Sequence, residues 1–445
     1  MREEFGRLAK LALPVIAAQL GMMMLGIVDI AMVGRLGART VAAVALGEVV
    51  VFGTWIIGLG LVMGIDPIVS QAHGAKRGEE AGLALQRGIV IGLLASLPIA
   101  AAWIFSRPLL EFLGQDAALA REAQIYTRTQ AFSVAPLIVF MALRQYLQGR
   151  EIVMAPMKVL LVANLVNVLL NWGLIFGNLG MPALGVRGAA LATGFTRIFM
   201  VAGLALLIVR RRMHAGAWVA WSRACLRPHG LAAVLRYGIP IAAQFALEVW
   251  AFNASTLLAG FLGVVPVAAH LVVLKLASLS FMVPLGISIA AATRVGNLLG
   301  AGDRARAQRA AWMALAMGGG ATIFAAALFL LFPRALPALF TTDGAVIALG
   351  ATILPIAAAF QLFDGTQVVG GGILRGMGDT RPAALYNLLG YYAVALPLAW
   401  WLVLRRGAGV SGIWWALCAG LFVVALLLVL RVARRGPSTV KELAI

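Results

Sequence analysis

The first long apolar stretch of the chain reads LALPVIAAQLGMMMLGIVDIAMV, from Leu11 to Val33, and Asp29 is its one ionisable residue. A helix needs roughly 20 apolar residues to cross a bilayer, and this stretch has that length. It is too long for the apolar core of a secretory signal peptide, and it lacks a clear small-residue cleavage site. We therefore expect a membrane-spanning helix here, with a carboxyl group inside it.

The composition of the whole chain agrees with this expectation. Hydrophobic residues make up 62% of the 445 residues, charged residues make up 12%, and the mean hydropathy is +0.96. Soluble domains carry about a quarter charged residues. Lipid leaves helices and closed barrels as spanning structures, and the long continuous apolar runs exclude the barrel. We expect an all-α polytopic membrane protein.

About twelve apolar runs of spanning length follow one another along the chain, six on each side of a polar stretch from Arg210 to Arg236. They lie near residues 8–33, 41–70, 82–105, 119–147, 155–176, 185–209, 231–259, 267–298, 304–331, 345–376, 380–404 and 409–431.

The distribution of basic residues predicts the orientation. The face that holds both termini and the central polar stretch collects 25 of the 36 Lys and Arg residues. Basic loops stay in the cytoplasm, so we expect both termini inside, in a bacterial cytoplasmic (inner) membrane. This asymmetry also accounts for most of the net charge of +19, so we expect no nucleic-acid partner.

The two sets of six spans share an internal repeat. We therefore expect an N-lobe at 1–209, a cytoplasmic linker at 210–230 and a C-lobe at 231–445, related by an axis along the membrane normal, with a cavity near the midplane. Short motifs carry the repeat, several of them 226 residues apart: Pro14 and Pro240, Gly34-Arg35-Leu36-Gly37 and Gly260-Phe261-Leu262-Gly263, Val41-Ala42-Ala43 and Val267-Ala268-Ala269, and Gly74-Ala75 and Gly300-Ala301.

The predicted spans contain Asp29, Glu48, Asp66, Glu248 and Asp364. A carboxylate at the centre of a span costs about 2.5–3.5 kcal/mol on insertion scales, which favours a functional role for Asp29, Glu248 and Asp364. Glu48 and Asp66 lie nearer the ends of the second span, where water or a structural partner is within reach.

Amides accompany these acids. Asn164, Asn167 and Asn171 fall at i, i+3 and i+7, on one face of the fifth span. Gln244 shares a helix face with Glu248, and Gln361 and Gln367 flank Asp364. Amide oxygens suit Na⁺ or a protonatable carboxyl group, whereas the alternative role is hydrogen bonding between helices, worth about 0.6 kcal/mol on average.

A buried carboxyl group can exchange a proton or Na⁺ for an organic cation, because burial disfavours its uncompensated charge. This exchange is the minimum chemistry of an antiporter, and Na⁺ would bind at the same acids. The chain has no GxxxxGK[ST], HExxH or GxSxG motif, so we expect no ATP drive within it and no enzyme activity. We expect no cofactor besides the coupling ion, H⁺ or Na⁺.

Over nearly its whole length the chain resembles the multidrug and toxic compound extrusion (MATE) family, in its NorM-like branch. The resemblance rests on Leu13-Pro14-Val15, Gly26-Ile27-Val28-Asp29, Met32-Val33-Gly34-Arg35, Ser70-Gln71-Ala72-His73-Gly74-Ala75, Asn167 to Asn171-Trp172, Gly238-Ile239-Pro240, Glu248, Arg294-Val295-Gly296-Asn297, and the run from Gln361 to Asp379.

The resemblance implies two six-helix lobes that form a V and export organic cations in exchange for Na⁺ or H⁺. It implies an N-lobe cation site of Asp29, Asn167, Asn171 and Thr193. It also implies a C-lobe site with Glu248 and Asp364. From the polar residues themselves we expect further support of the two sites by Gln244, Gln361, Gln367, Asn164 and Asp66. Glu48 and Asp66 depart from the pattern of many bacterial relatives.

We therefore expect a monomeric, secondary active multidrug efflux transporter that handles organic, mostly cationic compounds and drugs within the lipid bilayer. The alternative is a flippase for a lipid-linked sugar. That activity would need several basic residues facing the cavity, and Arg197 and Lys275 are the two of the 36 that we assign to neither face of the membrane.

Overall fold

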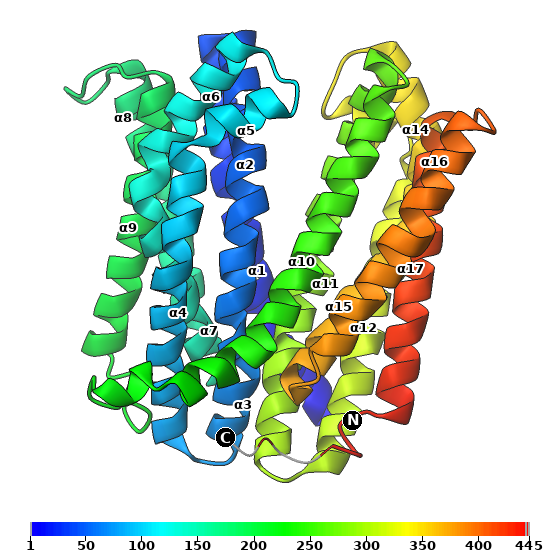
Figure 1. The fold of residues 1–445 in the computed structure, drawn as a ribbon. Coiled ribbons are helices and arrows are strands. Elements are labelled where there is room, and N and C mark those ends of the chain that lie inside the picture. The colour runs from blue at the N-terminus through cyan, green and yellow to red at the C-terminus, as the bar shows by residue number, and fades with distance from the viewer. Residues whose placement is uncertain (1, 441–442, 444–445) are drawn as a thin grey trace. The chain divides into compact units, whose positions relative to one another are not determined.

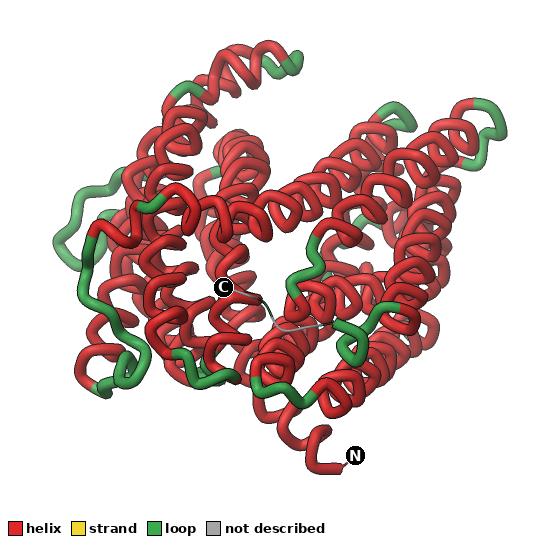
Figure 2. The backbone as a smooth tube through the Cα atoms, turned by 60° about the horizontal axis from the view of Figure 1, so that its bottom comes forward, coloured by secondary structure: helices red, strands yellow, loops and turns green. Residues whose placement is uncertain are grey.

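The computed structural model describes residues 2–440 and residue 443. Helices connected by short loops account for nearly all of them, and these residues form no β-strand (Figure 2). The expected all-α class is confirmed.

The α-helices follow the chain order shown in Figure 1. Their bounds are α1 Arg2–Val33, α2 Ala38–Val62, α3 Asp66–Gly74, α4 Gly78–Ile104, α5 Ser106–Phe112, α6 Ala117–Gln130, α7 Val134–Gly149, α8 Met154–Phe176, α9 Val186–Arg210, α10 Pro228–Gly260, α11 Val264–Gly300, α12 Arg304–Leu331, α13 Ala335–Ala338, α14 Gly344–Met377, α15 Arg381–Asn387, α16 Leu396–Leu404 and α17 Gly409–Arg434.

Within the described residues, twelve helical segments are long and apolar enough to cross a membrane, which confirms the predicted number. Three of them contain more than one α-helix. A 3₁₀ turn at Met63–Ile65 joins α2 to α3, and another at Ala131–Ser133 joins α6 to α7. A π-helical segment, Leu388–Ala395, joins α15 to α16.

The described chain packs as two compact units. Residues Ala17–Ala242 form one unit, and the residues up to Ile16 together with those from Ala243 onward form the other. Helices α1 and α10 therefore each contribute to both units. The two crossover points are 226 residues apart, the offset of the sequence repeat, and each lies two residues after a proline, Pro14 or Pro240. A proline inside a helix removes a backbone hydrogen bond and bends the helix.

This sharing of α1 and α10 goes beyond the predicted lobes, 1–209 and 231–445, whose boundaries remain a prediction. The linker at 210–230 packs within the first unit, over the ends of α4 and α7. The Tyr146 hydroxyl donates to the Ala217 carbonyl at 2.9 Å, and Gln86 Nε2 donates to the Val219 carbonyl at 2.7 Å.

Two glycines let the shared helices pack closely within each unit. Gly60 of α2 lies against the backbone of Ala242, and Gly286 of α11 lies against Ile16. A Cβ atom at either glycine would overlap with these neighbours, because the backbones approach too closely to leave room. Both pairs obey the 226-residue offset, so the repeat read from the sequence is also a repeat of packing.

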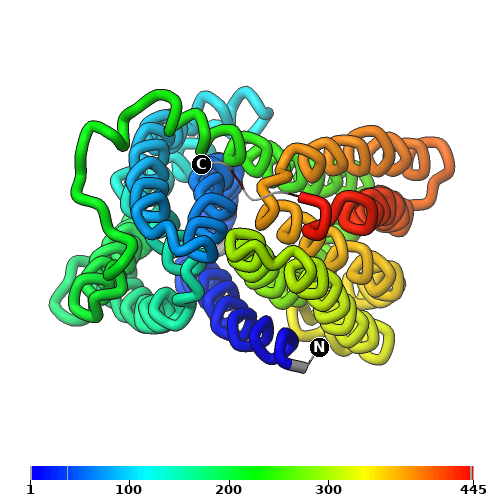
Figure 3. The backbone as a smooth tube through the Cα atoms, turned by 90° about the horizontal axis from the view of Figure 1, so that it is seen from below, coloured from blue at the N-terminus to red at the C-terminus, as the bar shows by residue number. Residues whose placement is uncertain are grey.

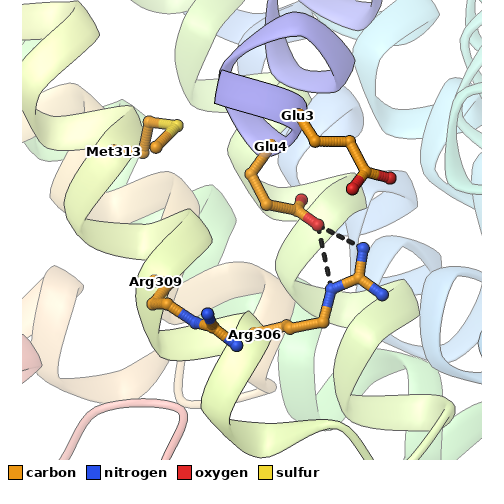
Figure 4. A pocket seen from close by; sticks show the side chains of 5 residues that line it. All are labelled: Glu3, Glu4, Arg306, Arg309 and Met313. Atoms are coloured by element: carbon orange, nitrogen blue, oxygen red, sulfur yellow. Dashed lines mark hydrogen bonds and ion pairs between the residues drawn. The ribbon is translucent and has the colours of Figure 1, made fainter. Parts of the chain in front are cut away.

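The start of α1 is held in its unit by a buried ion cluster. Glu4 receives two hydrogen bonds from Arg294 of α11, both at 3.0 Å, and contacts Arg306 of α12 at 2.5 Å. Figure 3 shows this start of α1 running beside α11 and α12, and Figure 4 shows Glu4 facing Arg306. In this unit α1 begins and α17 ends at the same, lower side of Figure 1, as an even number of spans requires.

Candidate functional site

Asp29 lies at the centre of a polar cluster built by three helices. It lies four residues before the end of α1, and only 5% of its surface is exposed. Asn167 and Asn171 of α8 donate to its Oδ1 at 3.2 and 2.6 Å, and Thr193 of α9 donates to its Oδ2 at 2.5 Å. The structure therefore brings together the four residues that were proposed for the N-lobe cation site.

The helical spacing of the asparagines explains this arrangement. Asn167 and Asn171 are one turn apart, so both amides face α1, and Asn171 also donates to the Oδ1 of Asn167 at 3.1 Å. Asn164 belongs to the same stripe but has a different role. Its amide donates to the backbone carbonyls of Gly21 and Leu160, which helps α8 pack on α1 and leaves Asp29 uncontacted.

The Asp29 cluster is electrically unusual because all three of its hydrogen-bond donors are neutral. In the described part of the chain, no Lys or Arg forms an ion pair with Asp29. The Oδ1 of Asn171 is buried and has no protein partner there. One carboxylate with nearby amide and hydroxyl oxygens is a hard donor set that suits Na⁺, and a proton on the carboxyl group can use the same acceptors.

Glu248 lies at a second cluster, in the other unit. Gln367 of α14 and Asn387 of α15 donate to Glu248 Oε2 at 3.3 and 3.4 Å, and Asn387 also donates to the Gln244 carbonyl at 3.4 Å. These bonds are long, so the Glu248 carboxyl group is held more loosely than that of Asp29.

Asp364 lies near Glu248 without a direct bond. It is 4% exposed, the two carboxyl groups interact electrostatically, and Asp364 Oδ1 has no hydrogen-bond partner among the described residues. Two carboxyl groups within electrostatic range make this cluster a second place where a cation would lower the electrostatic energy.

Two of the predicted supporting residues lie apart from the acids. Gln361 donates to the Ala277 carbonyl and to Ser280 Oγ, and so joins α14 to α11. The side chain of Gln244 packs against Gly371, and its backbone carbonyl, not its amide, joins the Glu248 cluster.

Asp66 and Glu48 have distinct neighbours. Asp66 is the first residue of α3 and accepts a hydrogen bond from Gln145 of α7 at 3.1 Å. This is a local structural contact between the two helices. Glu48 of α2 accepts a hydrogen bond from the Tyr126 hydroxyl of α6 at 2.6 Å.

Asn387 and Tyr126 are the two contacts that the sequence reasoning missed. Asn387 is a fully buried amide in the apolar run 380–404, so the polarity that singled out Asn167 could have identified it. Tyr126 carries no such signal, because a tyrosine in a span is ordinarily an apolar packing residue with a polar tip.

Comparison with known proteins gives consistent matches. The profile of the MatE family matches residues 14–173 and 240–401. The chain is 36% identical to a probable multidrug resistance protein NorM of Mesorhizobium japonicum, over 98% of this chain and 94% of that protein. It is 34% identical to the multidrug and toxin extrusion protein 2 of Mus musculus, over 100% of this chain and 77% of that protein.

Solved structures agree with the sequence matches. The eukaryotic MATE transporter AtDTX14 superposes with a TM-score of 0.91 at 27% identity, covering 98% of this chain and 97% of that one. An outward-facing multidrug resistance MATE family transporter superposes with a TM-score of 0.89 at 18% identity, over 98% and 96% of the two chains, which concerns the fold alone.

Proposed function

Because this chain belongs to the MatE family, we propose that it is a secondary active multidrug efflux transporter, which exchanges organic, mostly cationic compounds for H⁺ or Na⁺ by alternating access. It is a multi-pass membrane protein. Its place is the bacterial cytoplasmic membrane with both termini in the cytoplasm, it works as a monomer, and it needs no cofactor besides the coupling ion.

The observation that carries this proposal is the carboxyl group of Asp29, which is buried within a membrane-spanning helix and, among the described residues, accepts hydrogen bonds from neutral donors alone. An ionised carboxylate without a cationic partner is costly in a medium of low dielectric constant. A bound proton or Na⁺ removes that cost. Asp29 therefore favours cation binding, because no direct ion pair within the described residues competes for its carboxylate.

Coupling follows if the two cations exclude each other. The coupling ion neutralises Asp29 and the organic cation neutralises a different acid, so they exclude each other when each favours a different conformation. The membrane potential adds about 2.3 kcal/mol per charge per 100 mV to the driving force. Each cation then biases the equilibrium between two conformations by its difference in affinity for them.

The Glu248 and Asp364 cluster is the second acidic site, and we assign it to the same exchange. Its loose hydrogen bonds suit a larger and more variable ligand than a proton. We propose that it supplies the negative charge that an organic cation contacts, with Asn387 and Gln367 orienting Glu248.

The direct test is ethidium efflux from proteoliposomes in which the Na⁺ and pH gradients are set independently. Efflux that follows one gradient supports antiport and identifies the ion. Asp29→Asn and Asp364→Asn are compared with Glu79→Gln, a change at an exposed acid near the start of α4. Undiminished efflux in both site variants would refute the coupling assignment. Folded protein with no efflux under either gradient would favour a lipid flippase.

A further inference from the structure

Arg197 is a permanently charged residue inside the membrane-spanning helix α9. It donates to Ser133 Oγ at 2.9 Å, and its guanidinium lies 5.4 Å from the centre of the Trp103 ring. It forms no ion pair within the described residues. A guanidinium keeps its proton in proteins, so this positive charge persists whatever the neighbouring acids do. A charge at this depth calls for a negative charge within electrostatic range.

Glu48 is a half-buried acid in the same unit. Its Oε1 accepts the Tyr126 hydroxyl hydrogen at 2.6 Å, and Tyr126 is fully buried. The absence of a side chain at Gly47 makes room for the Tyr126 ring, since a Cβ atom there would lie 2.9 Å from it. A short bond to a buried neutral donor holds the Glu48 carboxylate in place and stabilises its charge.

A buried polar stripe lies between these two residues. Tyr126, Gln130 and Ser133 fall at i, i+4 and i+7 on α6 and the turn after it, and all three are completely buried. The stripe contacts Glu48 at Tyr126 and Arg197 at Ser133. Arg197 lies within electrostatic range of Glu48, Tyr126 and Asp29.

We propose that Glu48 is the fixed counter-charge of Arg197, and that this pairing leaves Asp29 as the one group whose charge changes when the coupling cation binds. The inference rests on the role of Asp29 in the proposed function. The ionisable groups involved are Asp29 of α1, Glu48 of α2, Tyr126 of α6 and Arg197 of α9. Trp103, which α4 contributes to this cluster, is neutral.

The charges explain why the pairing matters. Glu48 and Arg197 together are neutral, so the cluster is −1 when Asp29 is ionised and neutral when Asp29 holds a cation. Without Glu48 the net charge of the cluster is zero when Asp29 is ionised and +1 when Asp29 holds a cation. Arg197 then repels the coupling cation. Without Arg197 the net charge of the cluster is −2 when Asp29 is ionised and −1 when Asp29 holds a cation. The cation therefore binds tightly and dissociates slowly.

The experiment measures, in proteoliposomes, the concentration of H⁺ or Na⁺ that gives half-maximal ethidium transport. Glu48→Gln is expected to raise this concentration about tenfold, and Arg197→Gln to lower it about tenfold with a reduced maximal rate. The double variant Glu48→Gln/Arg197→Gln is expected to return to within about threefold of the unmodified protein.

Matched controls come from a surface ion pair in the same unit, Arg39 with Glu122 at 2.8 Å. Glu122→Gln, Arg39→Gln and their double variant are expected to leave the half-maximal concentration unchanged, because exposed pairs contribute little. If Glu48→Gln gives too little folded protein, the double variant should restore the yield, since it removes the uncompensated charge.

Shifts of Glu48→Gln and Arg197→Gln in the same direction, or a double variant no better than Glu48→Gln, would overturn the proposal. Either result would mean that Glu48 only packs or is itself an exchanging site. Failure of the proposed function is a separate outcome. In that case the unmodified protein shows no gradient-driven ethidium transport, or the Asp29→Asn variant still couples ethidium transport to the ion gradient.

Discussion

Asn171 Nδ2 lies 2.6 Å from Asp29 Oδ1, although 142 positions separate the two residues in the chain. This contact ties α8 to α1 through a neutral donor. A neutral amide orients the carboxyl group without supplying the charge that would make its ionised state permanent. The same cluster can therefore hold Asp29 in place both with and without a bound cation.

Replacing Asn171 should weaken binding of the coupling cation. Asn171→Leu removes the shorter of the two amide contacts to Asp29. Hydrogen bonds to charged groups contribute about 1.5–3 kcal/mol, so we expect the affinity for the coupling cation to fall roughly tenfold or more. The measurement is the half-maximal H⁺ or Na⁺ concentration for ethidium transport. The control is Asn164→Leu, since Asn164 donates only to backbone carbonyls. An equal shift in the control would contradict a special role for Asn171.

Replacing Asn387 should have a milder effect. Asn387 donates to Glu248 at 3.4 Å, a long bond, so we expect Asn387→Leu to reduce ethidium affinity by about threefold. Initial transport rates over a range of ethidium concentrations give this affinity. An effect on the coupling cation larger than that of Asn171→Leu would mean that the Glu248 cluster, not Asp29, binds the ion.

The ion cluster at the start of α1 should dominate the stability of its unit. The side chains of Glu4 and Arg294 are 9% and 7% exposed, so Glu4→Gln leaves a buried arginine poorly compensated and should cost about 3 kcal/mol. Glu3→Gln is the control, because Glu3 is 70% exposed and pairs with Arg7 at the surface. Thermal unfolding in detergent compares the two. Equal melting temperatures would show that the buried cluster is not stabilising.

The close approach at Gly286 gives a test of packing. Gly286→Ala places a Cβ atom 2.9 Å from the Ile16 backbone nitrogen, so we expect a loss of about 1–3 kcal/mol from overpacking. At Gly320 in α12 nothing lies within 4 Å, and Gly320→Ala should stabilise the helix by about 0.5–1 kcal/mol. The contrast is measured by thermal unfolding. If Gly286→Ala unfolds at the same temperature as the unmodified protein, α1 moves away from α11 at little cost in free energy.

The spans and the asparagine stripe could be predicted from sequence for simple physical reasons, whereas the grouping of Asn167, Asn171 and Thr193 with Asp29 came from the family resemblance. Lipid forces long apolar runs, so the twelve spans are visible in the composition of the chain. An asparagine stripe on an apolar helix is equally visible, which is why Asn167 and Asn171 were identified before their contact with Asp29 was known.

The crossover of α1 and α10 and the role of Gln361 could not be predicted. Apolar periodicity shows that a segment is buried, but it does not show which helices it packs against. Thus nothing in the sequence marks a partner for Glu4, and only the fold places it beside Arg294. Gln361 shares a helix with Asp364, yet its amide turns toward α11, because helix rotation decides which neighbour a side chain meets.

The most decisive measurement is the ion movement that accompanies substrate. Proteoliposomes without an imposed ion gradient receive an ethidium gradient, and internal dyes report H⁺ or Na⁺. We expect one of these ions to move opposite to ethidium in the unmodified protein, and we expect Asp29→Asn to abolish this movement while Glu79→Gln retains it. Ethidium transport without any opposing ion movement, or full ion movement in Asp29→Asn, would contradict antiport coupled through Asp29.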